Sequence, residues 1–466
     1  MRLDGVLTTA ASGLDSVSKQ LGIVGQNVAN ANTAGYVRES IALTALTAGN
    51  EGMGVRSGVA TRTLDSTLQG EVFGAAGQSA GDQLRSTALT AVDAAAGAPG
   101  SGQDLASLVG NLRDGFSALA NDPANQTQQH AVVTRAASLA QGLNTLGDAI
   151  GTARQTAQDG LLDDVAQANA GLRQLGVLSD AVMQARARGD STADLEDKRD
   201  TAMQSVAVLT GARFLRQANG DLLAVSGGTV LPLRSANGPL SIGAATLAPG
   251  STAPPLLVSG APAALGFAGS GGGAGGGSGG GRIGAALDLR DTVLPGLQAK
   301  ADSLGQNLAA GFSSAGLALF TDASGAPPAV PPAAATGFAQ GIQVNPAVTA
   351  TPSMVRDGAA AASTAGDTTL ISTVLNTVLA SGSGTLAGQA AALVADNAGL
   401  AATAAKRLDT SQGVQSSLST KLSAGTAVSV DSEMTDMVRL QNSYGANAKV
   451  LSAVQAMYTQ LLEIVR

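Results

Sequence analysis

The chain contains no cysteine in its 466 residues. This absence excludes disulfide bridges, zinc–thiolate centres and thiol nucleophiles, and it leaves no indication of the redox compartment. Tryptophan is also absent, and aromatic residues make up only 2% of the sequence. The hydrophobic fraction of 44% therefore rests mainly on Ala, Val and Leu. Side chains this small favour close packing between helices over a ligand pocket.

The chain has fewer basic than acidic residues. The chain has 27 Lys and Arg against 34 Asp and Glu, which gives a net charge of -7. This balance argues against nucleic acid or an anionic membrane as a partner. No uninterrupted apolar run of about eighteen residues occurs, so no membrane insertion is expected. The first residues carry an acid and two threonines where a signal peptide has an apolar run, which by itself indicates a cytoplasmic protein.

Few residues are candidates for a catalytic or metal-binding role. His130 is the single histidine, and it has no second histidine and no acid at helical spacing, so a solvated helix residue is favoured over a base or ligand. The acids of Asp194–Asp200 resemble a metal cluster, but Lys198 and Arg199 stand among them and favour a salt-bridged, solvated face. No Ser-His-Asp order and no metal-ligand spacing is found, so the sequence predicts no enzyme and no cofactor.

A glycine-rich stretch runs from Gly269 to Gly281. A GxGxxG pattern falls inside it, but no Gly-Lys-Ser/Thr follows. A run with so little order cannot hold a phosphate cage, so we expect a flexible surface loop.

Helical apolar seams stand at both ends of the chain. Near the N-terminus, Leu7, Ala10, Leu14, Val17, Leu21, Val24, Val28 and Ala31 repeat at alternating steps of three and four. Near the C-terminus the same spacing gives Val430, Met434, Met437, Gln441, Tyr444, Ala448, Leu451, Gln455, Tyr458, Leu462 and Val465. A seam of this period lets one helix lie along another. Two such seams at opposite termini predict that the ends of the chain pair.

The interior alternates between helical and β-like periods. Residues 37–75 read as small strands and loops, and helices are expected over 82–96, 103–119 and 153–188, and from 130 onward. From 211 the period changes to two, and Asn219-Gly220 predicts a hairpin. Helix resumes at 282, residues 326–352 are rich in Pro and Ala and are expected to be extended, and helices return from 368.

These patterns predict a mainly α fold with an inserted β domain and long terminal helices paired in a coiled-coil-like bundle. The predicted terminal assembly domain combines 1–75 with 415–466. A helical bundle domain combines 76–210 with 282–414, and a small β domain with the glycine-rich loop covers 211–281.

Short motifs add a family resemblance. Asn32-Thr-Ala-Gly-Tyr36 resembles the Asn-Thr-x-Gly-Tyr signature of the flagellar rod, hook and hook-associated proteins. The C-terminal stretch is similar to the matching end of that superfamily, whose pattern is met by Gln441, Tyr444, Ala446, Ala448, Lys449 and Val450. Gly445 departs from this pattern. A glycine in a helix interior costs about 1 kcal/mol of stability relative to alanine. Asp197, Arg199 and Asp200 resemble an Asp-x-Arg-Asp element of the hook-associated branch, of FlgK type.

The resemblance implies a structural subunit of the bacterial flagellum, at the junction between hook and filament and needed for filament assembly. It implies export through the flagellar type III channel without a cleaved signal peptide, and an extracellular position at the distal end of the hook. The implied partners are other copies in a ring, the hook protein, the next hook-associated protein and an export chaperone. The residues expected to carry assembly are Leu7, Leu14, Val17, Leu21, Val24, Val28, Asn32, Thr33, Gly35, Tyr36, Met434, Met437, Gln441, Tyr444, Ala448, Leu451, Tyr458 and Leu462.

Apart from an enzyme, which the sequence disfavours, two alternative functions remain open. A hook or rod protein of the same superfamily would be expected to lack the Asp197–Asp200 element and the long helix over 153–188. An exported coiled-coil scaffold or adhesin would share the low aromatic content but need not carry Asn-Thr-x-Gly-Tyr.

Overall fold

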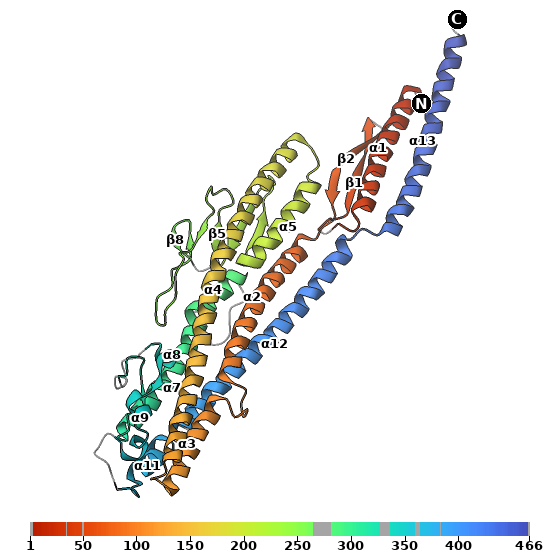
Figure 1. Cartoon of the computed structure of the whole chain (residues 1–466). Coiled ribbons are helices and arrows are strands. Elements are labelled where there is room, and N and C mark those ends of the chain that lie inside the picture. Colours follow the sequence, from red (N-terminus) through yellow and green to blue (C-terminus); the bar gives the residue numbers. More distant parts are fainter. Residues whose placement is uncertain are drawn as a thin grey trace. The chain divides into compact units, whose positions relative to one another are not determined.

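The computed structural model describes residues 3–33, 35–48, 51–263, 281–326, 336–358, 364–382 and 384–464. Long helices dominate these residues and small antiparallel sheets lie between them, so the predicted fold class is confirmed (Figure 1). Contacts divide the chain into two compact units. The terminal unit comprises residues 1–77, 167–239 and 412–466, and the helical unit comprises residues 78–166 and 240–411.

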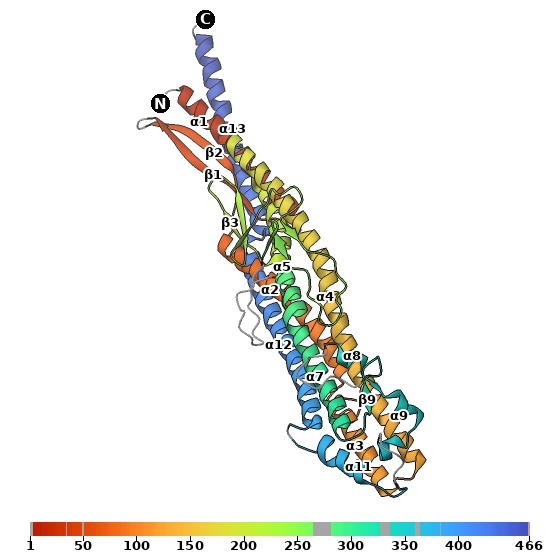
Figure 2. The same cartoon turned by 90° about the vertical axis from the view of Figure 1, so that its left-hand side faces the viewer.

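The terminal unit begins with α1 (Leu3–Asn30) and ends with α13 (Val430–Ile464). An antiparallel hairpin of β1 (Glu39–Ala48) and β2 (Glu51–Arg62) packs beside α1 (Figure 2). The Val55 amide on β2 donates a hydrogen bond to Ser12 Oγ on α1 at 3.1 Å. A two-stranded ribbon is marginal alone in water, so this packing supports it.

A second sheet in the terminal unit has the order β3 (Arg213–Arg216), β4 (Leu222–Ser226), β5 (Thr229–Leu231). The loop between β3 and β4 holds Gly220 at φ 94°, a conformation that glycine adopts without strain. The hairpin predicted from Asn219-Gly220 is thus confirmed. It follows α5 (Ala193–Thr210), which ends at Gly211 in the left-handed conformation.

Three helices contribute residues to both units: α2 (Ser66–Ala96), α4 (Gln126–Arg188) and α12 (Leu386–Thr426). The helix expected from 130 and the helix expected over 153–188 are one helix of 63 residues. The sequence contains no proline between Pro123 and Pro232, so nothing interrupts the hydrogen-bond ladder.

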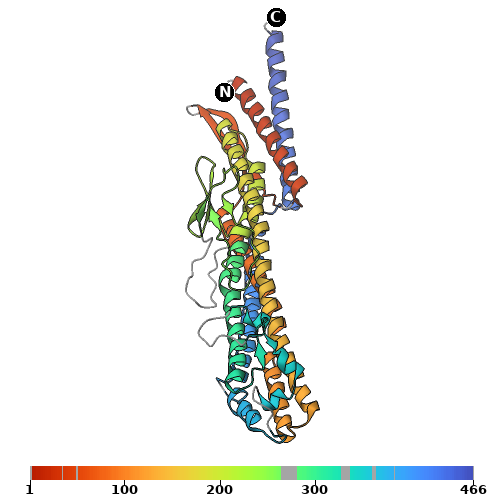
Figure 3. The ribbon, with the colours of Figure 1, turned by 60° about the vertical axis from the view of Figure 1, so that its left-hand side comes forward.

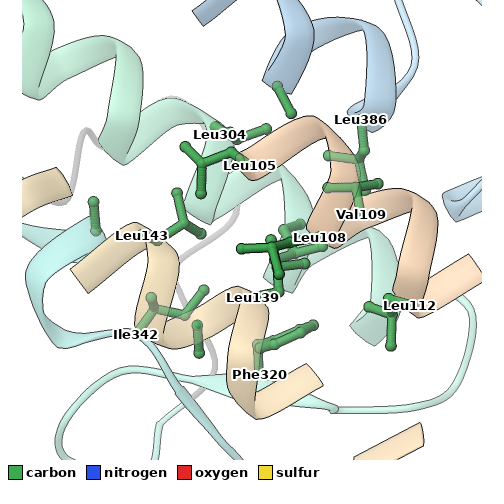
Figure 4. Close-up of a cluster of buried hydrophobic side chains, with 14 of the residues drawn as sticks. Leu105, Leu108, Val109, Leu112, Leu139, Leu143, Leu304, Phe320, Ile342 and Leu386 are labelled. Atoms are coloured by element: carbon green, nitrogen blue, oxygen red, sulfur yellow. The ribbon is translucent and has the colours of Figure 1, made fainter. Parts of the chain in front are cut away.

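The helical unit is built around an aliphatic and phenylalanine core. It joins α3 (Leu105–Asn121), the first part of α4, α7 (Leu294–Ser314) and the start of α12. Figure 4 shows Leu112, Leu139 and Phe320 pointing into this cluster, and all three are fully buried. Asp104 caps α3 by accepting a hydrogen bond from the Ser107 amide at 3.1 Å. Burial of this face is what holds the bundle together.

Short elements complete the helical unit. They are β6 (Leu240–Ser241), β7 (Leu257–Val258), β8 (Ala261–Pro262), α6 (Gly281–Asp288), the π-helical turn η1 (Leu289–Val293), β9 (Phe320–Thr321), α8 (Phe338–Gly341), β10 (Gln343–Val344), α9 (Pro346–Ala350), α10 (Met354–Asp357), α11 (Thr369–Thr373) and the π-helical turn η2 (Val374–Val378).

Two expectations from the sequence need correction or restriction. The extended conformation predicted for 326–352 is wrong for much of 336–352, because Asn345 caps the helical turn α9 by accepting from the Ala347 amide. The glycine-rich loop falls outside the described residues except for Gly281, which begins α6.

The division into units also differs from the predicted domains. The sheet β3–β5 belongs to the terminal unit and the sheet β6–β8 to the helical unit, so residues 211–281 do not form one inserted body. The change of period from helix to strand marks where strands occur. It carries no information on which helices each sheet packs against.

Candidate functional site

The terminal helices α1 and α13 pack side by side in antiparallel order. Figure 3 shows the N-terminus of α1 and the C-terminal end of α13 together. Val17 and Val24 of α1 are buried against Leu440 of α13, with Leu21 and Met437 at the edge of this small core. Toward the far end, the Tyr458 hydroxyl donates a hydrogen bond to the carboxylate of Asp4.

The helix pair approaches closely at one glycine. A Cβ atom placed on Gly13 would lie 3.0 Å from Nδ2 of Asn447, so the absent side chain makes room for the asparagine. Gly13 therefore sets the spacing of the two helices at the middle of the pair.

The predicted apolar residues of α1 are covered at least in part, and Val17, Leu21 and Val24 pack against α13. Val17 and Val24 are buried, while Leu7, Leu14, Leu21 and Val28 are half-buried. On α13 the buried face overlaps the predicted seam only in part. Its buried or half-buried residues include Glu433, Met437, Leu440, Asn447, Leu451, Val454 and Tyr458.

Only part of the predicted α13 seam therefore contacts α1. Met437, Ala448, Leu451 and Tyr458 are half-buried, but Met434, Gln441, Tyr444 and Leu462 are exposed. Besides Tyr444 and Leu462, six large apolar residues among the described part of α13 are at least 43% exposed: Val430, Met434, Val438, Val450, Met457 and Leu461. We call these six the outer residues of α13. Successive residues of an α-helix are rotated by about 100° around its axis. Val430, Met434 and Val438 therefore lie on one side of the buried face, and Val450, Met457 and Leu461 lie on the other.

The signature turn connects α1 to β1. Asn32 and Thr33 are exposed, and the Thr33 amide donates to the Asn30 carbonyl at 2.9 Å to close the end of the helix. Gly35 has φ 81°, which glycine accepts without strain. Tyr36 is half-buried and its hydroxyl donates to Oδ1 of Asn27 at 2.8 Å. The tyrosine of the signature thus holds the turn against the last helical turns of α1.

A buried polar cluster, which we call the latch, lies at the base of the helix pair. It consists of Asn27 on α1, Arg38 before β1 and Glu433 on α13. Asn27 Nδ2 donates to Glu433 Oε2 at 3.2 Å, and Arg38 Nε donates to Glu433 Oε1 at 2.6 Å. Asn27 also bonds both backbone groups of Glu39, each at 3.0 Å. The Asn27 and Glu433 side chains are fully buried, and their polar atoms are paired.

A second cluster surrounds Arg62 at the end of β2. Its guanidinium contacts Glu196 at 3.1 Å, Asp197 at 2.5 Å and Asp200 at 2.8 Å, all on α5. Arg216 on β3 donates to the other oxygen of Asp200 at 2.6 Å. This network holds the hairpin and the β3–β5 sheet to one helix.

The Asp194–Asp200 run is therefore not the solvated face that the sequence predicts. Asp197, Arg199 and Asp200 are buried. Their partners are distant in sequence: Arg199 donates to the Gly220 carbonyl at 2.8 Å, and Asp197 accepts from the Val37 amide at 3.3 Å. Lys198 and Arg199 stand among these acids, so the sequence favoured ion pairs within the run. The sequence does not show that the acids instead pair with Arg62, which is more than 130 positions away.

Burial and neighbouring charges shift the pKa values of several groups in and beside this cluster. Burial, and then the charges of Glu39 and Asp197, raise the pKa of the Tyr36 phenol, so the hydroxyl remains a donor. Burial also raises the pKa values of the Glu39 and Asp197 carboxyls, against the opposing effect of Arg62. For Glu196, the effect of burial is outweighed by Arg62 and by hydrogen bonds, and its pKa is lowered. The acids therefore differ in how firmly they hold a proton.

Among the described residues, no three His, Asp or Glu side chains gather to hold a metal ion. His130 is exposed on α4, as predicted. A cavity of about 610 Å³ lies in the helical unit, but Arg154 in its wall is committed to the Ala248 and Ser251 carbonyls and Asp302 to the Gly337 and Ala339 amides. These two charged side chains of the cavity wall therefore hold backbone segments in place.

None of the helices in the described ranges has both the length and the apolar character needed to cross a membrane.

Three family models match the sequence. The model of the flagellar hook-associated protein FlgK helical domain matches residues 89–321, which is half of the chain. The flagella basal body rod protein model matches residues 7–36, and the model of the flagellar basal body rod FlgEFG protein C-terminal matches residues 423–464. The last two matches fall on α1 with the signature turn and on α13.

Individual relatives agree with the family models. Flagellar hook-associated protein 1 of Salmonella typhimurium and that of Salmonella typhi are each 27% identical over 231 residues, which is 47% of this chain. The match spans 40% of the length of those relatives. The flagellar hook junction protein FlgK from Burkholderia pseudomallei is a similar solved structure, with 25% identity, a TM-score of 0.42 and coverage of 55% of this chain and 45% of that one.

Proposed function

Because this chain belongs to the FlgK family of flagellar hook-associated proteins, we propose that it is a structural subunit at the junction between hook and filament and that filament assembly requires it. The observation that carries the proposal is the match of the FlgK helical-domain model to half of the chain. Matches to rod-protein models at the two ends are compatible with it, since the rod and hook-associated proteins share those ends. The helical-domain match favours the hook-associated branch over a hook or rod protein.

We propose that the ends of the chain carry assembly. The outer residues of α13 leave apolar surface in water on a helix whose other face is already covered by α1. Exposed apolar surface of this kind is typical of an interaction site. Other copies of the chain in a ring, the hook protein and the next hook-associated protein are the proposed partners. An export chaperone is proposed for the chain before it leaves the cell.

We further propose that the protein acts outside the cell, at the distal end of the hook, and is exported without cleavage of a signal peptide. Its role is structural and requires no catalytic residue. The polar clusters around Glu433 and Arg62 fit that role, because their charged groups are paired within the protein and hold separate segments together.

Deletion of the gene in the bacterium that makes the protein tests the proposal. The deletion strain should build hooks but no filaments, and filament protein should accumulate in the medium. Expression of the intact chain should restore filaments. A deletion strain that builds normal filaments on its hooks would refute the proposed function.

A further inference from the structure

Apolar content alone does not explain which face of α13 packs against α1. The predicted series through Val430, Met434 and Met437 contains two polar residues, Gln441 and Gln455. The face that is actually covered also contains two, Glu433 and Asn447. The hydrophobic contribution scales with the apolar area removed from water, so apolar content does not separate the two faces. A contact of another kind must select the observed face.

The polar contacts of the latch distinguish the two faces. Glu433 is fully buried and accepts hydrogen bonds from Asn27 at 3.2 Å and from Arg38 at 2.6 Å. A rotation of α13 toward the apolar series would move Glu433 away from both donors. A slip by one heptad would separate Asn27 from Glu433 by about 10 Å along the helix axis. Either change leaves Asn27 and Glu433 without these bonds, which is unfavourable for buried groups.

The surroundings of the latch make it selective. Asn27 is held in one orientation, because its amide bonds both backbone groups of Glu39 and its Oδ1 accepts from Tyr36. Arg38 is placed by its own backbone, whose amide donates to the Thr426 carbonyl at 3.1 Å just before α13 begins. The Asn27 side chain and the Arg38 backbone are therefore held by contacts that do not involve α13, and only one rotation and one register of α13 place Glu433 between the two donors.

We propose that the latch of Asn27, Arg38 and Glu433 determines the register and the contact face of the α1–α13 pair, while the apolar residues supply its stability. A single buried polar group can fix register in paired helices in this way. In the proposed function, the consequence is that the outer residues of α13 are always presented to neighbours. The inference itself concerns the isolated chain and is tested there, so its failure leaves the proposed function standing.

Disulfide formation between introduced cysteines tests the proposal directly, because the chain has no cysteine of its own. Gly13→Cys with Asn447→Cys reports the observed register, since these positions are in contact. Gly13→Cys with Val454→Cys reports a slip by one heptad, and Gly13→Cys with Tyr444→Cys reports a rotation of α13. In the full chain with an intact latch, the 13–447 pair should form at least about tenfold faster than the other two.

Glu433→Leu removes the latch acid without leaving a buried charge unpaired, since Arg38 is 36% exposed and can turn to water. In this background the preference for the 13–447 pair should fall to about twofold or less. Leu440→Ala should weaken the pair but keep the preference. Asp436→Asn removes an acid that lies 3.8 Å from Arg38 and should keep it as well.

Three results would overturn the proposal. One is an unchanged preference in Glu433→Leu. Another is an equal loss of preference in Leu440→Ala, which would show that stability alone sets the register. The third is a loss of all three cross-links in Glu433→Leu together with a loss of helix by circular dichroism, because Glu433 would then hold the pair together rather than choose its register.

Discussion

Arg62 joins segments of the chain that lie far apart in sequence. It ends β2 and contacts Glu196, Asp197 and Asp200 on α5, and its side chain is only 4% exposed. Burial alone would lower its pKa, but Asp200 and Asp197 raise it overall, so the guanidinium stays charged. Buried charges of this kind are tolerated only when they are paired.

Removal of this arginine should therefore destabilise the terminal unit strongly. Arg62→Met keeps most of the aliphatic stem but leaves three carboxylates without their shared cation, at a cost of roughly 3–5 kcal/mol. Urea unfolding followed by circular dichroism measures the loss. Arg56→Met on the same strand is the control, because Arg56 is exposed, and it should change stability by less than about 0.5 kcal/mol. Equal stability of the two variants would show that the Arg62 cluster contributes little.

Glu39 makes a second prediction, this one dependent on pH. The residue is buried, its Oε1 has no hydrogen-bond partner among the described residues, and burial raises its pKa. The ionised carboxylate thus destabilises the fold at neutral pH, and protonation relieves this as the pH falls through the raised pKa. Glu39→Gln should raise the melting temperature at pH 7 by a few degrees, and the difference from the native chain should vanish below the ordinary glutamate pKa of about 4.3.

The exposed Glu71 on α2 supplies the matched control for this measurement. Glu71→Gln should leave the melting temperature unchanged at both pH values. A Glu39→Gln variant that is less stable than the native chain at pH 7 would mean that the carboxylate has a stabilising partner, which contradicts the account of its burial.

At the scale of elements, helix positions follow from periodicity but their contacts do not. The α1 seam could be predicted because almost all its apolar residues lie on one face. On α13, apolar residues lie on several faces, so the period does not single out the face that α1 covers. In the inference proposed above the latch selects it, and Glu433 lies about four hundred positions from Asn27 and Arg38 in the sequence. The β3–β4 hairpin was predictable because Asn219-Gly220 is a local signal.

The exposed outer residues of α13 give a prediction at this scale. Met434→Asp places a charge on exposed apolar surface, so the isolated chain should keep its melting temperature, but cells should lose motility because the charge would be buried on assembly. Leu440→Asp should lower the melting temperature as well, since Leu440 is already buried against α1. Thr435→Asp adds the same charge at an exposed polar position and should affect neither property. Normal swimming of the Met434→Asp strain would exclude this surface from assembly.

At the scale of the whole molecule, the account rests on a division of roles. The helical unit has its own large core. The FlgK helical-domain match covers residues 89–166 and 240–321 of this unit and residues 167–239 of the terminal unit. In the terminal unit the apolar cluster between α1 and α13 is small, and Leu172, Val182 and Val206 are fully buried apart from it on α4 and α5. Buried ion pairs and hydrogen bonds join the other segments of this unit. The composition already indicated close packing between helices. The division of the chain into these units was not predictable, because it depends on long-range contacts such as those of Arg62.

The central claim, that this protein is a structural subunit at the junction of hook and filament, is tested most directly by its position. Gold-labelled antibody against the protein, applied to purified hook–basal bodies and viewed by electron microscopy, gives that position. The account predicts label confined to the distal end of the hook. Label along the length of the hook would identify a hook protein instead, and hooks that carry no label at either end would contradict the claim.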